Sequence, residues 1–117
     1  MLWDPSKDKS VEPALDEVGQ MMVLAADYLE THRWGQGDFI LANGAVCLMG
    51  ALIKIETDEV HSAQKEGYYP EETCHKAVQA LNRIRSYVNR DPYEWNDAHG
   101  RKKSEVIATL REAVKLK

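Results

Sequence analysis

The segment from Ala45 to Ile55 is apolar at nearly every position, and this run constrains the fold more than any other feature of the sequence. A segment that is apolar on all sides needs other elements packed around it. Its length suits either a strand or a central buried helix. We predict a strand up to about Val46 and a helix after it. Thr57 precedes two acidic residues and is typical of a helix cap, so we expect the helix to break and restart there.

Amphipathic patterns on either side of this run predict the helices that cover it. Ser10 is a candidate N-cap, and apolar residues at three- and four-residue spacing predict a helix from there to about Thr31. Pro70 and the pair Asp91-Pro92 each begin a later helical segment, and a last helix runs to the C-terminus. The buried stripes are predicted to contain Ala14, Leu15, Val18, Met21, Met22, Ala25, Leu29, Ala77, Leu81, Ile84, Val88, Val106, Ile107, Leu110, Ala113 and Val114.

A short β-hairpin is predicted between the first and second helices. Phe39 to Leu41 lead into Asn43-Gly44, the dipeptide that best suits a type I′ turn. The expected fold class is therefore mostly α (α+β), a compact bundle of four or five helices with one short β-hairpin. A chain of 117 residues supports one hydrophobic core, so we expect a single helical domain over 11–117 after a polar leader, 1–10.

Composition excludes several classes of protein. The chain is 44% hydrophobic and 29% charged, which is typical of a globular protein rather than a disordered one. No stretch approaches the ~20 apolar residues of a membrane span, and no basic segment precedes an apolar run as in a signal peptide. We therefore expect a cytoplasmic location, no membrane contact, and Cys47 and Cys74 as free thiols.

The net charge of −4 conceals an uneven distribution of charged residues. Residues 1–74 hold 5 Lys and Arg against 14 Asp and Glu, whereas residues 75–117 hold 10 against 5. An acidic total argues against nucleic-acid binding, which depends on neutralising phosphates, although the basic half leaves weak association as an alternative. The other interpretation is that the two halves complement each other when they pack.

Four short elements occur in a distinctive order: Trp34-Gly35-Gln36-Gly37, Cys47-Leu48-Met49-Gly50-Ala51-Leu52, Trp95-Asn96-Asp97 and Gly100-Arg101. Over about residues 14–115 the chain resembles an uncharacterised family of small actinobacterial and actinophage proteins that carries these elements in this order. The resemblance implies a compact α-rich fold with a minor β element and no known activity. The family usually has Thr where this chain has Lys102, so we expect Ser104 to cap the last helix instead.

Cys47 is the sharpest catalytic candidate. A thiol near a helix N-terminus can become a nucleophile if a base such as His32, His75 or His99 and an orienting Asn96 or Asp97 lie in reach. The alternative, which we favour, is a small core residue next to Gly50 and Ala51, which allow close packing.

Cys74 and His75 add zinc-type ligands, but adjacent helical residues point about 100° apart and no Cys-x-x-Cys pair is present, so we expect no metal and no cofactor.

The two tryptophan elements and a tyrosine pair are the candidate binding residues. Trp34, Gln36, Asn96, Asp97 and Arg101 can form a ligand-binding loop pair, with Asp97 as acid or base and Arg101 as an anion clamp. Alternatively, Trp34 and Trp95 fill the core while Gln36, Asn96 and Asp97 satisfy backbone groups of turns and helix ends. Tyr68 and Tyr69 form a candidate exposed aromatic patch for a partner, or else cover the edge of the core.

These observations predict a non-enzymatic accessory or regulatory protein, from an actinophage or an actinobacterium, that acts by binding another protein such as a bacterial host factor. A homodimer is a further assembly to consider. One alternative is a small enzyme that uses Cys47 as its nucleophile, and another is weak nucleic-acid association through the basic C-terminal half.

Overall fold

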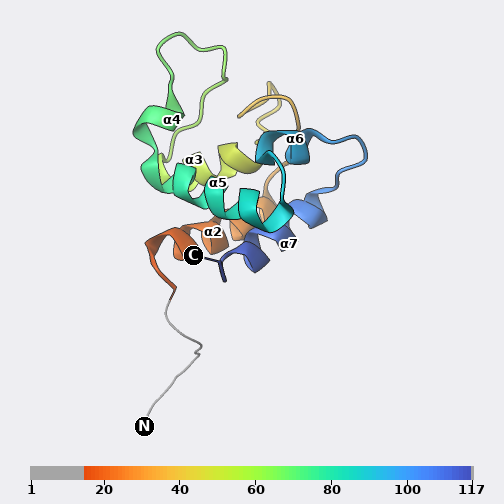
Figure 1. The fold of residues 1–117 in the computed structure, drawn as a ribbon. Helices are drawn as coiled ribbons and strands as arrows, with labels where there is room; N and C mark the ends of the chain where they lie inside the picture. The colour runs from red at the N-terminus through yellow and green to blue at the C-terminus, as the bar shows by residue number, and fades with distance from the viewer. Residues whose placement is uncertain (1–14, 117) are drawn as a thin grey trace.

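The computed structural model describes residues 15–116, and within them six helices pack into one bundle (Figure 1). The helices are α2 (Glu17–Thr31), α3 (Leu48–Thr57), α4 (Pro70–Thr73), α5 (His75–Val88), α6 (Pro92–Asp97) and α7 (Lys103–Ala113). The mostly α class is confirmed, with one helix more than the upper predicted number among these residues. None of the helices between Leu15 and Leu116 is both long and apolar enough to cross a bilayer.

Helix α3 occupies the centre of the core. Every residue from Leu48 to Ile53 is buried, and α2, α5 and α6 all contact this helix. Helix α2 also packs against α5 and α7, so the amphipathic helices surround the apolar one as Figure 1 shows. The predicted helix after Val46 is confirmed, because burial on all sides is what an all-apolar segment requires.

The predicted β-hairpin is wrong. Val46 forms isolated bridges to Trp34 and Ile40, and the described residues contain no strand. The chain does turn at Asn43-Gly44, but of these two only Gly44 has a positive φ, whereas a type I′ turn needs a positive φ at both. Cys47 then caps α3 directly after Val46, so pairing cannot extend along the chain.

Several predicted helix boundaries also need correction. The Ser10 cap and the leader over 1–10 lie outside the described residues, and α2 begins at Glu17 with Asp16 as its N-cap, after Leu15. The helix does not restart at Thr57. The Thr57 hydroxyl donates to the Ile53 carbonyl at 3.0 Å, and the next residue ends α3 in a left-handed conformation. The chain is not helical again until α4.

The acidic and basic halves of the sequence meet across the bundle. Carboxylates on and just before α2 pair with cations on α5 and α7, and the N–O distances to Glu17, Asp27 and Glu30 are 2.8–3.0 Å. The pairs are Lys76 with Glu17, Arg83 with Asp16, and Arg111 with both Asp27 and Glu30. Part of the charge asymmetry therefore serves packing between the two halves.

Candidate functional site

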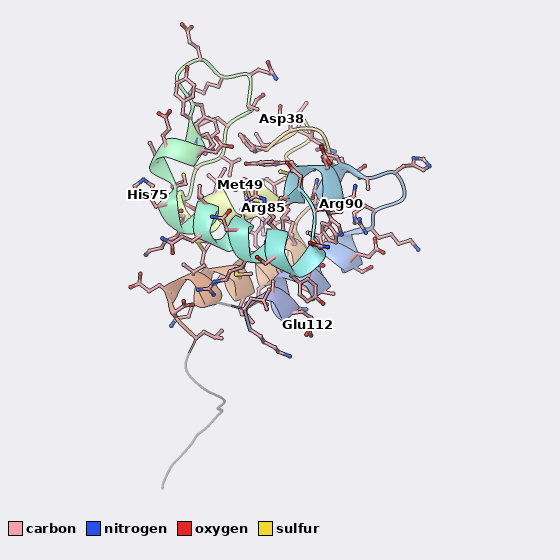
Figure 2. All side chains as sticks on the ribbon, in the orientation of Figure 1. Asp38, Met49, His75, Arg85, Arg90 and Glu112 are labelled. Atoms are coloured by element: carbon pink, nitrogen blue, oxygen red, sulfur yellow. The ribbon has the colours of Figure 1, made fainter. Side chains whose placement is uncertain are left out.

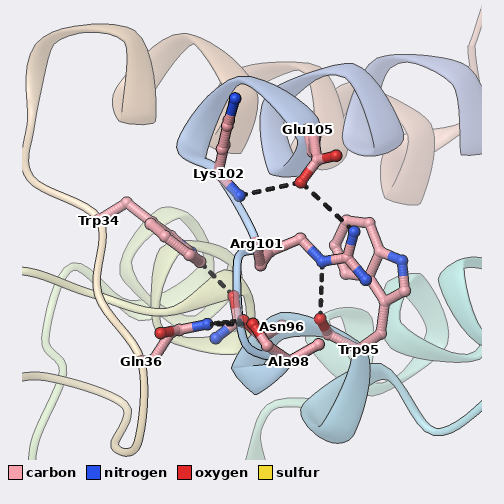
Figure 3. Close-up of polar contacts among 8 residues, drawn as sticks. All are labelled: Trp34, Gln36, Trp95, Asn96, Ala98, Arg101, Lys102 and Glu105. Carbon is pink, nitrogen blue, oxygen red and sulfur yellow. Dashed lines mark hydrogen bonds and ion pairs between the residues drawn. The ribbon is translucent and has the colours of Figure 1, made fainter.

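Asn96 on α6 joins three parts of the chain through hydrogen bonds. Its side chain is only 2% exposed. Its Oδ1 accepts from Trp34 Nε1 at 2.8 Å, as Figure 3 shows, and from the Leu48 backbone amide at 3.1 Å. Its Nδ2 donates to Asp97 Oδ1 at 2.8 Å and to the Gly35 carbonyl at 3.4 Å. The amide therefore holds the loop before α3, the first turn of α3 and α6 in one arrangement.

Gln36 and Asp97 reinforce this junction. Gln36 Nε2 donates to the carbonyls of Asn96 and Ala98, both at 2.9 Å (Figure 3). Asp97 Oδ1 accepts from the Gly37 amide at 3.1 Å. Both contacts are of the kind expected if these side chains satisfy backbone groups of turns and helix ends. The predicted role of the same side chains in binding a ligand stays a prediction.

Arg101 contacts Trp95 and Glu105, and its predicted role as an anion clamp stays a prediction. Its guanidinium carbon lies 3.9 Å from the centroid of the Trp95 ring, and its Nε donates to the Trp95 carbonyl at 2.8 Å. Figure 3 also shows Glu105 between Arg101 and the Lys102 amide, which donates to Glu105 at 2.9 Å. Lys102 is therefore the N-cap residue of α7, and the predicted Ser104 cap is wrong.

Cys47 is the N-cap of α3 and is buried. Its Sγ accepts from the Gly50 amide at 3.4 Å, and the residue is 4% exposed. Burial raises the pKa of the thiol to about 11, although the amides of Met49 and Gly50 act in the opposite direction. The neighbouring Asp97 carboxylate further disfavours the thiolate. A neutral thiol is a poor nucleophile, so this environment does not activate Cys47.

The histidines that could serve as a base are engaged elsewhere or exposed. His32 stacks on Tyr28 with ring centroids 3.9 Å apart, and His75 contacts the Glu72 carbonyl at 3.1 Å. His99 is exposed and makes no hydrogen bond within residues 15–116. Over the same residues no group of three or more His, Cys, Asp or Glu side chains is arranged to hold a metal ion. None of these three histidines makes a hydrogen bond with Cys47 in residues 15–116, so the predicted pair of a thiol and an imidazole base is not formed.

An apolar cavity of about 210 Å³ lies in front of Cys47, where α3, α5, α6 and two loops meet. Its apolar walls are contributed by Phe39, Leu48, Met49, Leu81, Pro92 and Tyr93. Ala63, which is exposed, lines it from the loop between α3 and α4. Concave sites with apolar walls and a few polar groups are typical of binding sites.

Asp38 fixes the loop that borders this cavity; Figure 2 labels it together with Met49 on α3. Its Oδ1 accepts from the amides of Phe39 at 2.6 Å and Ala63 at 2.7 Å, and its Oδ2 accepts from the Ser62 hydroxyl at 2.6 Å. Burial opposes ionisation of the carboxyl, but these three donors outweigh it and lower the pKa of Asp38. Both oxygens of this carboxylate are therefore already occupied.

Tyr93, on the opposite wall, donates its hydroxyl hydrogen to Glu71 Oε2 at 2.7 Å. Burial and this carboxylate together raise the pKa of Tyr93 far above its usual range. The hydroxyl is therefore neutral at physiological pH and acts as a hydrogen-bond donor. It ties α6 to α4 and keeps the aromatic ring against the cavity.

The family of the chain follows from its sequence as a whole. Residues 13–116 match a family described as a family of unknown function, DUF6197. The chain belongs to this family. No curated protein matches it significantly, and no solved structure does. Membership of DUF6197 assigns no activity, so the function has to be argued from the site.

In this DUF6197 member, sequence reasoning pointed to some of the residues that line the cavity and missed the others. Cys47, Asn96 and Asp97 line the cavity, and Trp34 and Gln36 bond to Asn96 from outside the lining. Arg101 contacts Trp95, which does not line the cavity. The remaining lining residues come from five separate segments and carry no common motif. The signal that could have indicated the site is Asp38, a carboxylate directly before an apolar run.

The predicted Tyr68–Tyr69 patch is divided by the structure. Tyr68 is half-buried, and its ring meets those of Phe39 and His61 edge-on at centroid distances of 6.0 and 5.0 Å. Tyr69 is 61% exposed. Tyr68 therefore covers the edge of the core, while Tyr69 alone remains available on the surface.

Proposed function

We propose that this chain is a non-enzymatic binding protein whose apolar cavity receives one side chain of a partner protein. The observation that carries the proposal is that the thiol, the tyrosine hydroxyl and one of the two carboxylates in the lining are already engaged. The Cys47 thiol caps α3, the Asp38 carboxylate holds three donors, and the Tyr93 hydroxyl is bonded to Glu71. The one open carboxylate in the lining, Asp97, has no activated nucleophile beside it, and such a cavity suits recognition better than catalysis.

The size and walls of the cavity suit a single large apolar group. A dry apolar cavity of about 150 Å³ is large enough for benzene, so about 210 Å³ accommodates an aromatic or branched aliphatic side chain. Filling it removes apolar surface from water on both partners, which favours association. Asn96 and Asp38 hold the loop and helices that form the walls, so little conformational freedom needs to be lost on binding.

The setting proposed for this binding is a bacterial cell. The resemblance of the Trp, Cys and Trp-Asn-Asp elements to actinobacterial and actinophage proteins supports such an origin, with a bacterial host protein as the partner. A nucleic-acid partner is less well supported, because Lys76, Arg83 and Arg111 of the basic half are paired with carboxylates of the acidic half. A second copy of the chain remains an alternative protein partner.

Blocking the cavity tests the proposal. Ala63→Trp places a bulky ring at the lining without removing the Ala63 amide that Asp38 binds. We expect peptides selected on the wild-type protein from a phage-displayed random dodecapeptide library to bind Ala63→Trp at least roughly tenfold more weakly, since their apolar anchor is excluded. Dissociation constants are measured by fluorescence anisotropy.

The matched control is Ala42→Trp, another exposed loop alanine that does not line the cavity. It should bind the selected peptides as the wild-type protein does, and both variants should unfold cooperatively on heating. Selection that enriches no peptide, or equal binding by Ala63→Trp and Ala42→Trp, would show that the cavity is not the binding site.

A further inference from the structure

We infer that the partner segment carries a Lys or Arg beside the apolar residue that fills the cavity, an inference that rests on the proposed function. The lining contains two carboxylates, Asp38 and Asp97, and no cationic side chain. An apolar cavity with negative charge at its border favours an apolar segment of positive charge and disfavours an acidic one.

Asp97 is the carboxylate that can accept this cation. Both of its hydrogen bonds, from the Gly37 amide and from Asn96 Nδ2, are made at Oδ1. Its Oδ2 has no hydrogen-bond or ion-pair partner in the part of the chain that the structure describes, and the residue is exposed. Asp38, by contrast, has donors on both oxygens. The two bonds at Oδ1 orient Asp97 while leaving the other oxygen open to a partner.

Two further carboxylates lie beside residues that line the cavity. Glu71 is held next to the cavity by the Tyr93 hydroxyl, and Asp91 caps the start of α6. The neighbouring cation Arg101 packs on Trp95 and pairs with Glu105 at 3.3 Å. A further cation, Lys65, lines a separate cavity together with Glu59 and Glu66. Within residues 15–116, no cationic side chain forms an ion pair with Asp97.

Two aromatic rings in the lining favour a cation that is carried on an aliphatic side chain. The rings of Phe39 and Tyr93 lie 6.3 Å apart between centroids, tilted by 51°. Lys and Arg place methylene groups against apolar surface while the charged end reaches a polar partner, and a cation near an aromatic face gains further attraction. A segment with an apolar residue and an adjacent Lys or Arg thus fits both the walls and the border.

Charge removal on both partners tests this inference. From the selected dodecapeptides, one binder is remade with its basic residue replaced by Gln and its apolar residues kept. We expect Asp97→Asn to weaken binding of the original peptide about fivefold, the size expected for an exposed ion pair. The Gln peptide should bind the wild-type protein about fivefold more weakly and should not distinguish it from Asp97→Asn.

Glu94→Gln is the matched control, because Glu94 is an exposed carboxylate on the same helix that does not line the cavity. It should leave binding unchanged. Asp97→Asn keeps an Oδ1 acceptor for Gly37 and Asn96, and if it nevertheless fails to fold, the comparison of the two peptides on the wild-type protein decides alone. Selected peptides without a Lys or Arg, or binding insensitive to both charge removals, would overturn this inference while leaving binding in the cavity intact. Failure of the Ala63→Trp test would instead overturn the proposed function.

Discussion

Replacing Gly50 by Ala is expected to lower the free energy of unfolding by about 3 kcal/mol, although the same change inside a helix ordinarily stabilises it by about 1 kcal/mol. A Cβ at this position would lie 2.1 Å from the Phe39 carbonyl oxygen. That oxygen accepts from the Cys47 amide at 3.2 Å, so the backbone is held in place and cannot move away easily. Urea denaturation measures the change in the free energy of unfolding. On heating, the midpoint temperature of unfolding should fall by roughly 15 °C.

Gly35→Ala is the matched control for this prediction. A Cβ there would meet the end of the Leu41 side chain at 2.3 Å, and a flexible side chain can rotate where a bonded carbonyl cannot. We expect a loss below about 1 kcal/mol. If Gly50→Ala were as stable as the wild-type protein, the close approach of the loop to α3 would not exist as described.

Asn96→Ala is expected to cost about 3 kcal/mol of unfolding free energy. The change removes the acceptor shared by Trp34 Nε1 and the Leu48 amide and leaves both donors without their partner. Each buried donor left unsatisfied costs about 1–3 kcal/mol. The measurement is the free energy of unfolding in guanidinium chloride, compared between the variant and the wild-type protein.

A double-mutant cycle with Trp34→Phe separates the hydrogen bond from packing. Trp34→Phe removes the indole donor, so part of the effect of Asn96→Ala should disappear in that background. We expect the two losses to fall short of additivity by about 1 kcal/mol. Additive losses would mean that the 2.8 Å contact between these side chains contributes nothing to stability.

Most of the helices could be predicted from the sequence because the residue patterns that indicate them are local. The end of α2 at Thr31, the start of α4 at Pro70 and the short helix after Asp91 all follow from apolar periodicity, proline and capping residues. The central position of α3 could also be predicted from the sequence, since a run that is apolar on all sides has to be surrounded by other elements. The predicted start of α7 was wrong because the helix begins after Lys102, whose amide donates to the Glu105 side chain.

The loop between α2 and α3 shows where local reasoning fails. Asn43-Gly44 does form a turn, and the Leu41 and Cys47 amides donate across it to the carbonyls of Ala45 and Phe39. The pairing ends there because Cys47 begins the α3 cap. The Gly35 amide also donates to the Val46 carbonyl at 3.0 Å, so this side of the turn pairs with an earlier segment as well. The cavity was equally hidden, because Leu81 and Tyr93 reach it from helices far from Cys47 in sequence. Such convergence depends on packing, which no short motif encodes.

Site-specific alkylation of Cys47 tests most directly whether this site recognises a partner rather than performing chemistry. The wild-type protein is treated with iodoacetamide between pH 7 and pH 10, and peptide mass mapping distinguishes Cys47 from Cys74. A buried thiol with a pKa of about 11 should react at least roughly a hundredfold more slowly at pH 7.5 than in urea-unfolded chain, and faster as the pH rises. Rapid modification of Cys47 in the folded protein at pH 7.5 would contradict the account and favour a cysteine nucleophile.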